Sequence, residues 1–125
     1  MESGYKRKIR VLFVASGSAR RAQAAAEVAT ASGWMEARAS CVPPMMAADG
    51  PALQEPAWDW PDVVVALDEP ARRQVPQLRP STRVKCYEFP EPEDAVAWPA
   101  TLAALRSRVL GMAAGLAMMQ RAAQE

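Results

Sequence analysis

The stretch that decides the fold is VLFVASGSARRAQAAAE, residues 11–27. It begins inside the nearly continuous apolar run IRVLFV of residues 9–14, which is typical of a strand buried on both faces of a parallel sheet. Small residues follow at 15–18, then two arginines, within a helical segment expected from Ala19 to Ser32 and capped by Gly33. Strand, small-residue loop, arginine and helix in this order form pockets for phosphate-like anions, because helix N-termini attract negative charge.

The rest of the chain continues the alternation of strands and helices. We expect strands over residues 36–42, 62–67 and 83–87, a short helix over 69–78 that Pro76 disturbs near its end, and a long final helix from near Trp98 to Arg121. The proline-rich segments 43–56 and 89–92 are expected to be loops. This pattern predicts one domain over residues 1–125, a flavodoxin-like three-layer α-β-α fold with a four-stranded parallel sheet.

Composition argues against several classes of function. Lys plus Arg number 15 against 14 Asp plus Glu, and a net charge of +1 gives no support for nucleic-acid binding. The chain has no histidine, which removes Ser–His and Cys–His catalytic pairs and the commonest transition-metal ligand. We expect neither a metal ion nor a cofactor. With no membrane-length apolar stretch and no signal-peptide pattern, a cytoplasmic protein is expected, and Cys41 and Cys86 are expected to be buried thiols rather than a redox pair.

The opening stretch resembles the phosphate-binding loop of the low-molecular-weight protein tyrosine phosphatases and the related arsenate reductases. That family places a nucleophilic cysteine after the first strand, then five residues, an arginine, and a serine or threonine. Here Ala15 stands at the cysteine position, Arg21 at the arginine position, and Ala22 where the serine or threonine belongs. The likeness extends to DVVVALDEPARRQVPQL, residues 62–78, and to YEFPEPEDA, residues 87–95, in which Glu91 stands where the family has its general acid.

The resemblance implies an anion cradle that has lost its nucleophile. The thiolate and the hydroxyl that supports it are both missing, which indicates natural loss of catalysis. The residues expected to surround an anion are Ser16, Gly17, Ser18, Ala19, Arg20 and Arg21. We therefore expect a catalytically inactive phosphatase-like protein that binds a phosphate-like oxyanion or an anionic group of a partner protein at this loop, or that serves as an interaction module.

Other interpretations stay open at this point. An active phosphatase or arsenate reductase would need an unrecognised nucleophile, such as Ser16 or Ser18 with a carboxylate base, or a relay through one of the cysteines. The loop could also bind nothing and only connect, with Glu91 or Asp68 closing it against an arginine. A phosphocarrier domain of the sugar-transport type has this fold, but it too depends on the missing cysteine.

The final helix carries a second pattern. Its apolar residues recur by three and four, as in a heptad seam, at Leu102, Leu105, Val109, Met112, Leu116 and Met119. About two and a half heptads is short for a free-standing coiled coil, so docking of this helix onto the sheet is the favoured interpretation. A homodimer or a partner helix on the same seam, widened by Leu110 and Met118, is the alternative.

Overall fold

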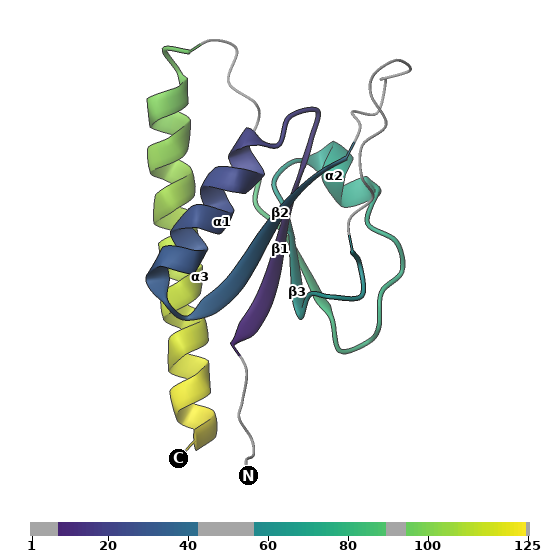
Figure 1. The fold of residues 1–125 in the computed structure, drawn as a ribbon, viewed down its shortest axis with the longest axis vertical. Coiled ribbons are helices and arrows are strands. Elements are labelled where there is room, and N and C mark those ends of the chain that lie inside the picture. Colours follow the sequence, from purple (N-terminus) through teal and green to yellow (C-terminus); the bar gives the residue numbers. More distant parts are fainter. Residues whose placement is uncertain (1–7, 43–56, 90–94, 125) are drawn as a thin grey trace.

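The computed structural model describes residues 8–42, 57–89 and 95–124, drawn in colour in Figure 1. The elements follow in the order β1 (Ile9–Ser16), α1 (Arg20–Ser32), β2 (Met35–Val42), β3 (Val63–Ala66), α2 (Glu69–Arg73), β4 (Arg83–Cys86) and α3 (Trp98–Gln124). All strand pairs are parallel, and the strands lie in the order β2-β1-β3-β4. This strand order is consistent with a flavodoxin-like fold, as the sequence predicted.

The two central strands are apolar on both faces. β3 is buried along its whole length, and β1 is buried from Val11 to Ala15. Their register sets Val11 beside Val63, so that valine packs beside valine in the middle of the sheet. The expected first strand is confirmed, and it runs on to Ser16. Ala15 and Ser16 are therefore the last two residues of β1 rather than the first two residues of the loop.

The two faces of the sheet are covered unequally (Figure 1). α1 and α3 lie on one face, where Phe13, Val65 and Leu105 belong to a single buried cluster. The other face carries α2, whose Ala71 packs with the opposite side chains of β1 and β3. Because α2 has only five residues, it covers only part of this face. Trp58 and Trp60, from the connection between β2 and β3, also pack on it. The three layers are therefore present, but one of them is mostly irregular chain.

The expected helix over residues 69–78 is shorter than predicted. α2 ends at Arg73, and the Gln74 and Val75 amides donate to Ala71 and Arg72 carbonyls in a tightened last turn. Pro76 is the physical reason, because proline has no N–H to donate and it disfavours helical backbone at the preceding residue. The expected loop at 43–56 lies outside the described residues.

The final helix docks through part of its apolar seam. Leu105, Val109 and Met112 are buried against the core, which confirms the docking interpretation for these three residues. Leu102, the first residue of the predicted seam, is instead 36% exposed, and Leu110 and Met118 are 41% and 68% exposed on the outer side of the helix. The side chains of Leu116 and Met119 lie outside the described part of the structure, and the homodimer or partner helix stays a prediction. None of the helices within the described ranges is long and apolar enough to cross a membrane.

Candidate functional site

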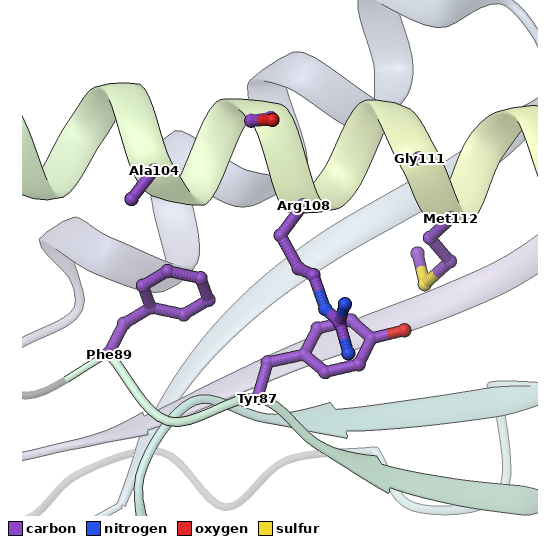
Figure 2. Close-up of a pocket in the computed structure, with 7 residues that line it drawn as sticks. Tyr87, Phe89, Ala104, Arg108, Gly111 and Met112 are labelled. Carbon is purple, nitrogen blue, oxygen red and sulfur yellow. The ribbon is translucent and has the colours of Figure 1, made fainter.

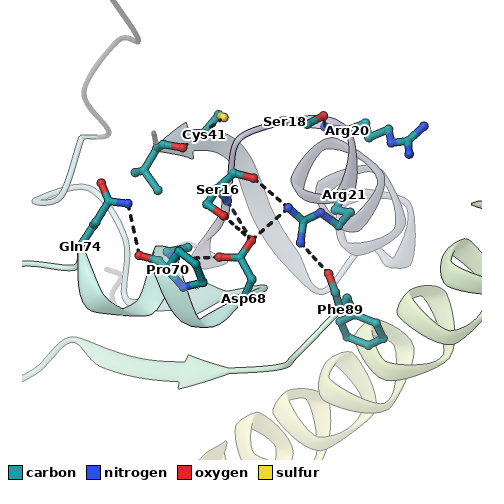
Figure 3. Close-up of polar contacts among 11 residues, drawn as sticks. Ser16, Ser18, Arg20, Arg21, Cys41, Asp68, Pro70, Gln74 and Phe89 are labelled. Carbon is teal, nitrogen blue, oxygen red and sulfur yellow. Dashed lines mark hydrogen bonds and ion pairs between the residues drawn. The ribbon is translucent and has the colours of Figure 1, made fainter. Parts of the chain in front are cut away.

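The carboxyl ends of β1, β3 and β4 bring together residues that are far apart in the sequence (Figure 3). Ser16 ends β1, Asp68 follows β3, and Phe89 follows β4, while Arg21 lies in the first turn of α1. Parallel strands end at the same edge of a sheet, and that edge is where ligands of such folds bind. The residues that meet here form the candidate site.

The Asp68 carboxylate contacts β1, α1 and α2 at this site. Its Oδ2 accepts hydrogen bonds from the Ser16 N–H at 3.0 Å and from the Ser16 hydroxyl at 2.9 Å, and lies 3.0 Å from Nη2 of Arg21. Its Oδ1 accepts the N–H of Ala71 at 2.8 Å and so caps the N-terminus of α2. A single carboxylate thus joins the end of β1, the start of α2 and the arginine that the sequence singled out.

Arg21 is only 1% exposed. Besides Asp68, its guanidinium reaches two backbone carbonyls: Nη1 donates to Phe89 at 2.6 Å, and Nη2 donates to Ser16 at 2.9 Å. A buried cation is tolerated only when pairing and hydrogen bonds offset its desolvation. The side chain therefore holds three connections of the sheet together in the structure.

The backbone amides of the loop point to several different acceptors. Ser16 donates to Asp68, Gly17 to the Val42 carbonyl at 2.9 Å, and Ser18 to the Ser16 carbonyl at 2.9 Å. The Arg20 amide donates to Oγ of Ser18 at 3.3 Å. Gly17 has φ 79°, a left-handed backbone that favours glycine at this turn. These four amides do not converge on one point in this structure.

The two arginines have separate roles. The Arg20 side chain points away from Asp68, and its guanidinium lies 4.4 Å from the ring centroid of Trp98 at the start of α3 (Figure 3). Ala19 precedes α1 as its N-cap and makes no side-chain capping hydrogen bond. Of the residues expected to surround an anion, the structure therefore brings only the side chains of Ser16 and Arg21 together around Asp68.

The two alanines at the degenerate positions are packed in the core. Ala15 and Ala22 have no exposed surface and belong to the same buried cluster. Between the two expected ways of closing the loop, Asp68 is found against Arg21, whereas Glu91 lies outside the described residues. Sequence reasoning missed the Phe89 carbonyl, because a backbone acceptor carries no side-chain signal.

The cysteines are placed differently from the expectation. Cys41 and Cys86 are only partly buried, because each lies on an edge strand of the sheet. Two strands separate them, so three interstrand spacings place them about 14 Å apart, too far for a disulfide. Burial raises the pKa of the Cys86 thiol, with Glu69 and Glu88 acting in the same direction, which disfavours its thiolate.

The Asp68 carboxylate is held in its charged form. Burial acts to raise its pKa, but hydrogen bonds from the Ser16 and Ala71 amides and from the Ser16 hydroxyl, together with the charge of Arg21, leave the pKa below its ordinary value. A carboxylate with a lowered pKa in the folded chain stabilises the fold above its unfolded pKa. That stabilisation is lost as the pH falls through the folded pKa.

This shift predicts a pH dependence of stability. Below about pH 4, the free energy of unfolding of the wild-type chain should fall more steeply than that of Asp68→Asn, which has no proton to take up at this position. Urea denaturation between pH 7 and pH 3 measures both slopes. Equal slopes for the two proteins would contradict the prediction.

No protein-family model matches this chain, and no curated protein matches it either. The fold and site alone define its class: an α/β protein with a four-stranded parallel sheet and a buried Arg21–Asp68 ion pair at the carboxyl edge. Within the described ranges, no group of three or more His, Cys, Asp or Glu side chains is placed to hold a metal ion.

Proposed function

We propose that this chain is a catalytically inactive, phosphatase-like interaction module whose loop between β1 and α1 is held closed by Asp68. One observation carries the proposal: buried Arg21 has the Asp68 carboxylate as its anionic partner, 3.0 Å away. Carboxylates and phosphate-like oxyanions present oxygen acceptors to the same guanidinium donors. An anionic group of a partner, or a free oxyanion, therefore reaches Arg21 only by displacing Asp68.

The alternative, a serine-dependent enzyme, also has a specific observation in its favour. The Ser16 hydroxyl donates to Oδ2 of Asp68 at 2.9 Å, as a nucleophile would to its base. A base has to accept the hydroxyl proton, however, and the pKa of Asp68 lies below its ordinary value. Such a carboxylate is too weak a base for an unassisted serine, and the chain has no histidine to replace it.

Turnover separates the two functions. The wild-type protein should hydrolyse p-nitrophenyl phosphate no faster than buffer does, and Ser16→Ala should give the same result. The measurement is nitrophenolate release at neutral pH, with an active phosphatase as positive control. A wild-type rate that Ser16→Ala removes would establish the serine mechanism and overturn the proposal.

Anion titration tests the closed loop directly. Phosphate should give no saturable rise in the melting temperature of the wild-type protein, but a saturable rise for Asp68→Asn, which leaves Arg21 without its carboxylate. At 100 times the dissociation constant, one bound anion stabilises a protein by about 2.7 kcal/mol. The matched control is Asp62→Asn, because Oδ2 of Asp62 accepts the Arg10 N–H at 2.9 Å at the opposite end of β1.

Two results would contradict this part of the proposal. A saturable response of the wild-type protein would mean that the loop is open without any substitution. Equal responses of Asp68→Asn and Asp62→Asn would mean that phosphate acts on the surface in general and that Arg21 holds no anion.

A further inference from the structure

A second concave region lies away from the Asp68 carboxylate, between α3 and the segment that leaves β4 (Figure 2). This pocket has a volume of about 530 Å³, within the range of about 300–1,000 Å³ that is usual for small-molecule sites. Residues that line it include Tyr87, Phe89, Ala104, Arg108, Gly111 and Met112. Its lining, which combines two aromatic rings and other apolar groups with the Ser107 hydroxyl and one cation, differs from that of the closed loop.

The cation is held across an aromatic ring. The Arg108 guanidinium reaches from α3 over Tyr87 and lies 4.3 Å from the ring centroid (Figure 2). A stacked guanidinium is fixed in orientation while its N–H edge remains suited to a planar carboxylate. Among the described residues, none of the ion pairs involves Arg108.

A second positive charge, that of Lys85, lies on the same face of the sheet as Tyr87 of the pocket. The Tyr87 amide donates to the Ala66 carbonyl, so the strand pattern of β4 continues to Tyr87. Side chains alternate along a strand, and Lys85 therefore shares the face of Tyr87, whereas Glu88 points to the opposite face. The pocket thus combines two aromatic rings and Met112 with polar groups in similar proportion and with positive charge, which favours a ligand that has an aromatic part and an anionic end.

We propose that this pocket binds a small aromatic carboxylate, with the carboxylate on Arg108 and the ring among Tyr87, Phe89 and Met112. Inorganic phosphate alone leaves the aromatic walls in contact with water, and a neutral aromatic compound gives Arg108 no anionic partner. The proposal does not depend on an open β1–α1 loop, because Phe89 contributes its ring here and only its carbonyl to Arg21.

The helix offers a matched pair of variants. An added Cβ at Gly111 or at Gly115 meets no atom within 4 Å, and of the two only Gly111 lines the pocket. Leucine has a better helix propensity than glycine, so neither substitution threatens α3. Gly111→Leu fills the pocket from its wall, and Gly115→Leu makes the same change one turn further along.

The experiment is a titration of the full chain with 3-phenylpropionate. Calorimetry measures the affinity, and NMR chemical shifts of the backbone amides locate the binding site. Saturable binding is expected, with shifts centred on Tyr87 and Arg108. Arg108→Gln should weaken it at least about tenfold, since a charge-assisted hydrogen bond is lost. Arg106→Gln, at an exposed position on the same helix outside the pocket, should leave the affinity unchanged. Gly111→Leu should abolish binding and Gly115→Leu should preserve it.

Three probes assign the chemistry. 3-Phenylpropionamide should bind at least about tenfold more weakly than the acid, because it lacks the charge that pairs with Arg108, and propionate should not saturate the site. Equal affinity for acid and amide, or equal effects of the two glycine variants, would overturn the proposal. Saturable binding of an acidic peptide without any binding of 3-phenylpropionate would also overturn it, because it would assign this surface to a protein partner.

Discussion

Replacing Asp68 by alanine is expected to lower the free energy of unfolding by about 3–5 kcal/mol. The side chain of Asp68 is 12% exposed and that of Arg21 is 2% exposed, so solvent screens their ion pair only slightly. Removing the carboxylate takes a negative charge away from the buried Arg21 guanidinium, and it also removes the N-cap acceptor for Ala71. Urea denaturation monitored by circular dichroism measures the loss.

Asp62→Ala is the control for this substitution. Asp62 also accepts a β1 amide with its Oδ2, from the Arg10 N–H at 2.9 Å, but it does so at the opposite end of β1. Loss of one such hydrogen bond is expected to cost about 1 kcal/mol. If the two alanine variants are equally stable, the Arg21–Asp68 pair is not what holds the carboxyl edge together.

If Asp68→Ala does not fold, Asp68→Asn can be used for the same stability measurement. Asparagine retains a side-chain oxygen that can cap α2, so this variant isolates the charge of Asp68 from its shape. It should still destabilise the wild-type chain, but much less so in an Arg21→Met background, because the buried cation is then absent. Equal losses in the two backgrounds would show that the two side chains are not coupled.

Local patterns were enough to predict the strands, because each pattern is written in neighbouring residues. The apolar run of β1 and the DVVVAL segment of β3 have no polar face, and both became central strands. The sequence predicts that Gly33 ends α1. It does so with φ 82°, and its N–H donates to the Thr30 carbonyl. These features depend on side-chain size, polarity and backbone freedom within a few residues.

The organisation of the site depends on long-range geometry instead. Ser16 and Asp68 are 52 residues apart, and only the strand order places their side chains at one edge. The sequence offered two carboxylates that could close the loop, Asp68 after a predicted strand and Glu91 in a late loop. Their positions in the sequence do not show which of them lies nearer to Arg21 in space. The pocket beside Arg108 was not predicted, since it depends on how α3 lies against the segment that leaves β4.

The second large loss of stability is expected for a substitution in α3. Leu105→Ala is expected to cost about 2–5 kcal/mol, since it deletes a fully buried leucine from the cluster that joins α3 to the sheet and leaves a cavity there. Leu110→Ala is the control on the same helix, because Leu110 is 41% exposed. A surface substitution of that kind should change stability by no more than about 0.5 kcal/mol. Thermal and urea unfolding measure both losses.

The same pair of variants distinguishes docking from dimerisation. If α3 serves mainly as a core helix, Leu105→Ala destabilises the fold and Leu110→Ala changes neither stability nor mass in sedimentation equilibrium. A concentration-dependent dimer that Leu110→Ala dissociates would instead assign the outer stripe, which includes Met118 at 68% exposure, to contact with a second copy of the chain. Because Leu105 faces the sheet in either case, its large loss is expected whether or not the chain dimerises, and only the Leu110 result decides the role of the outer stripe.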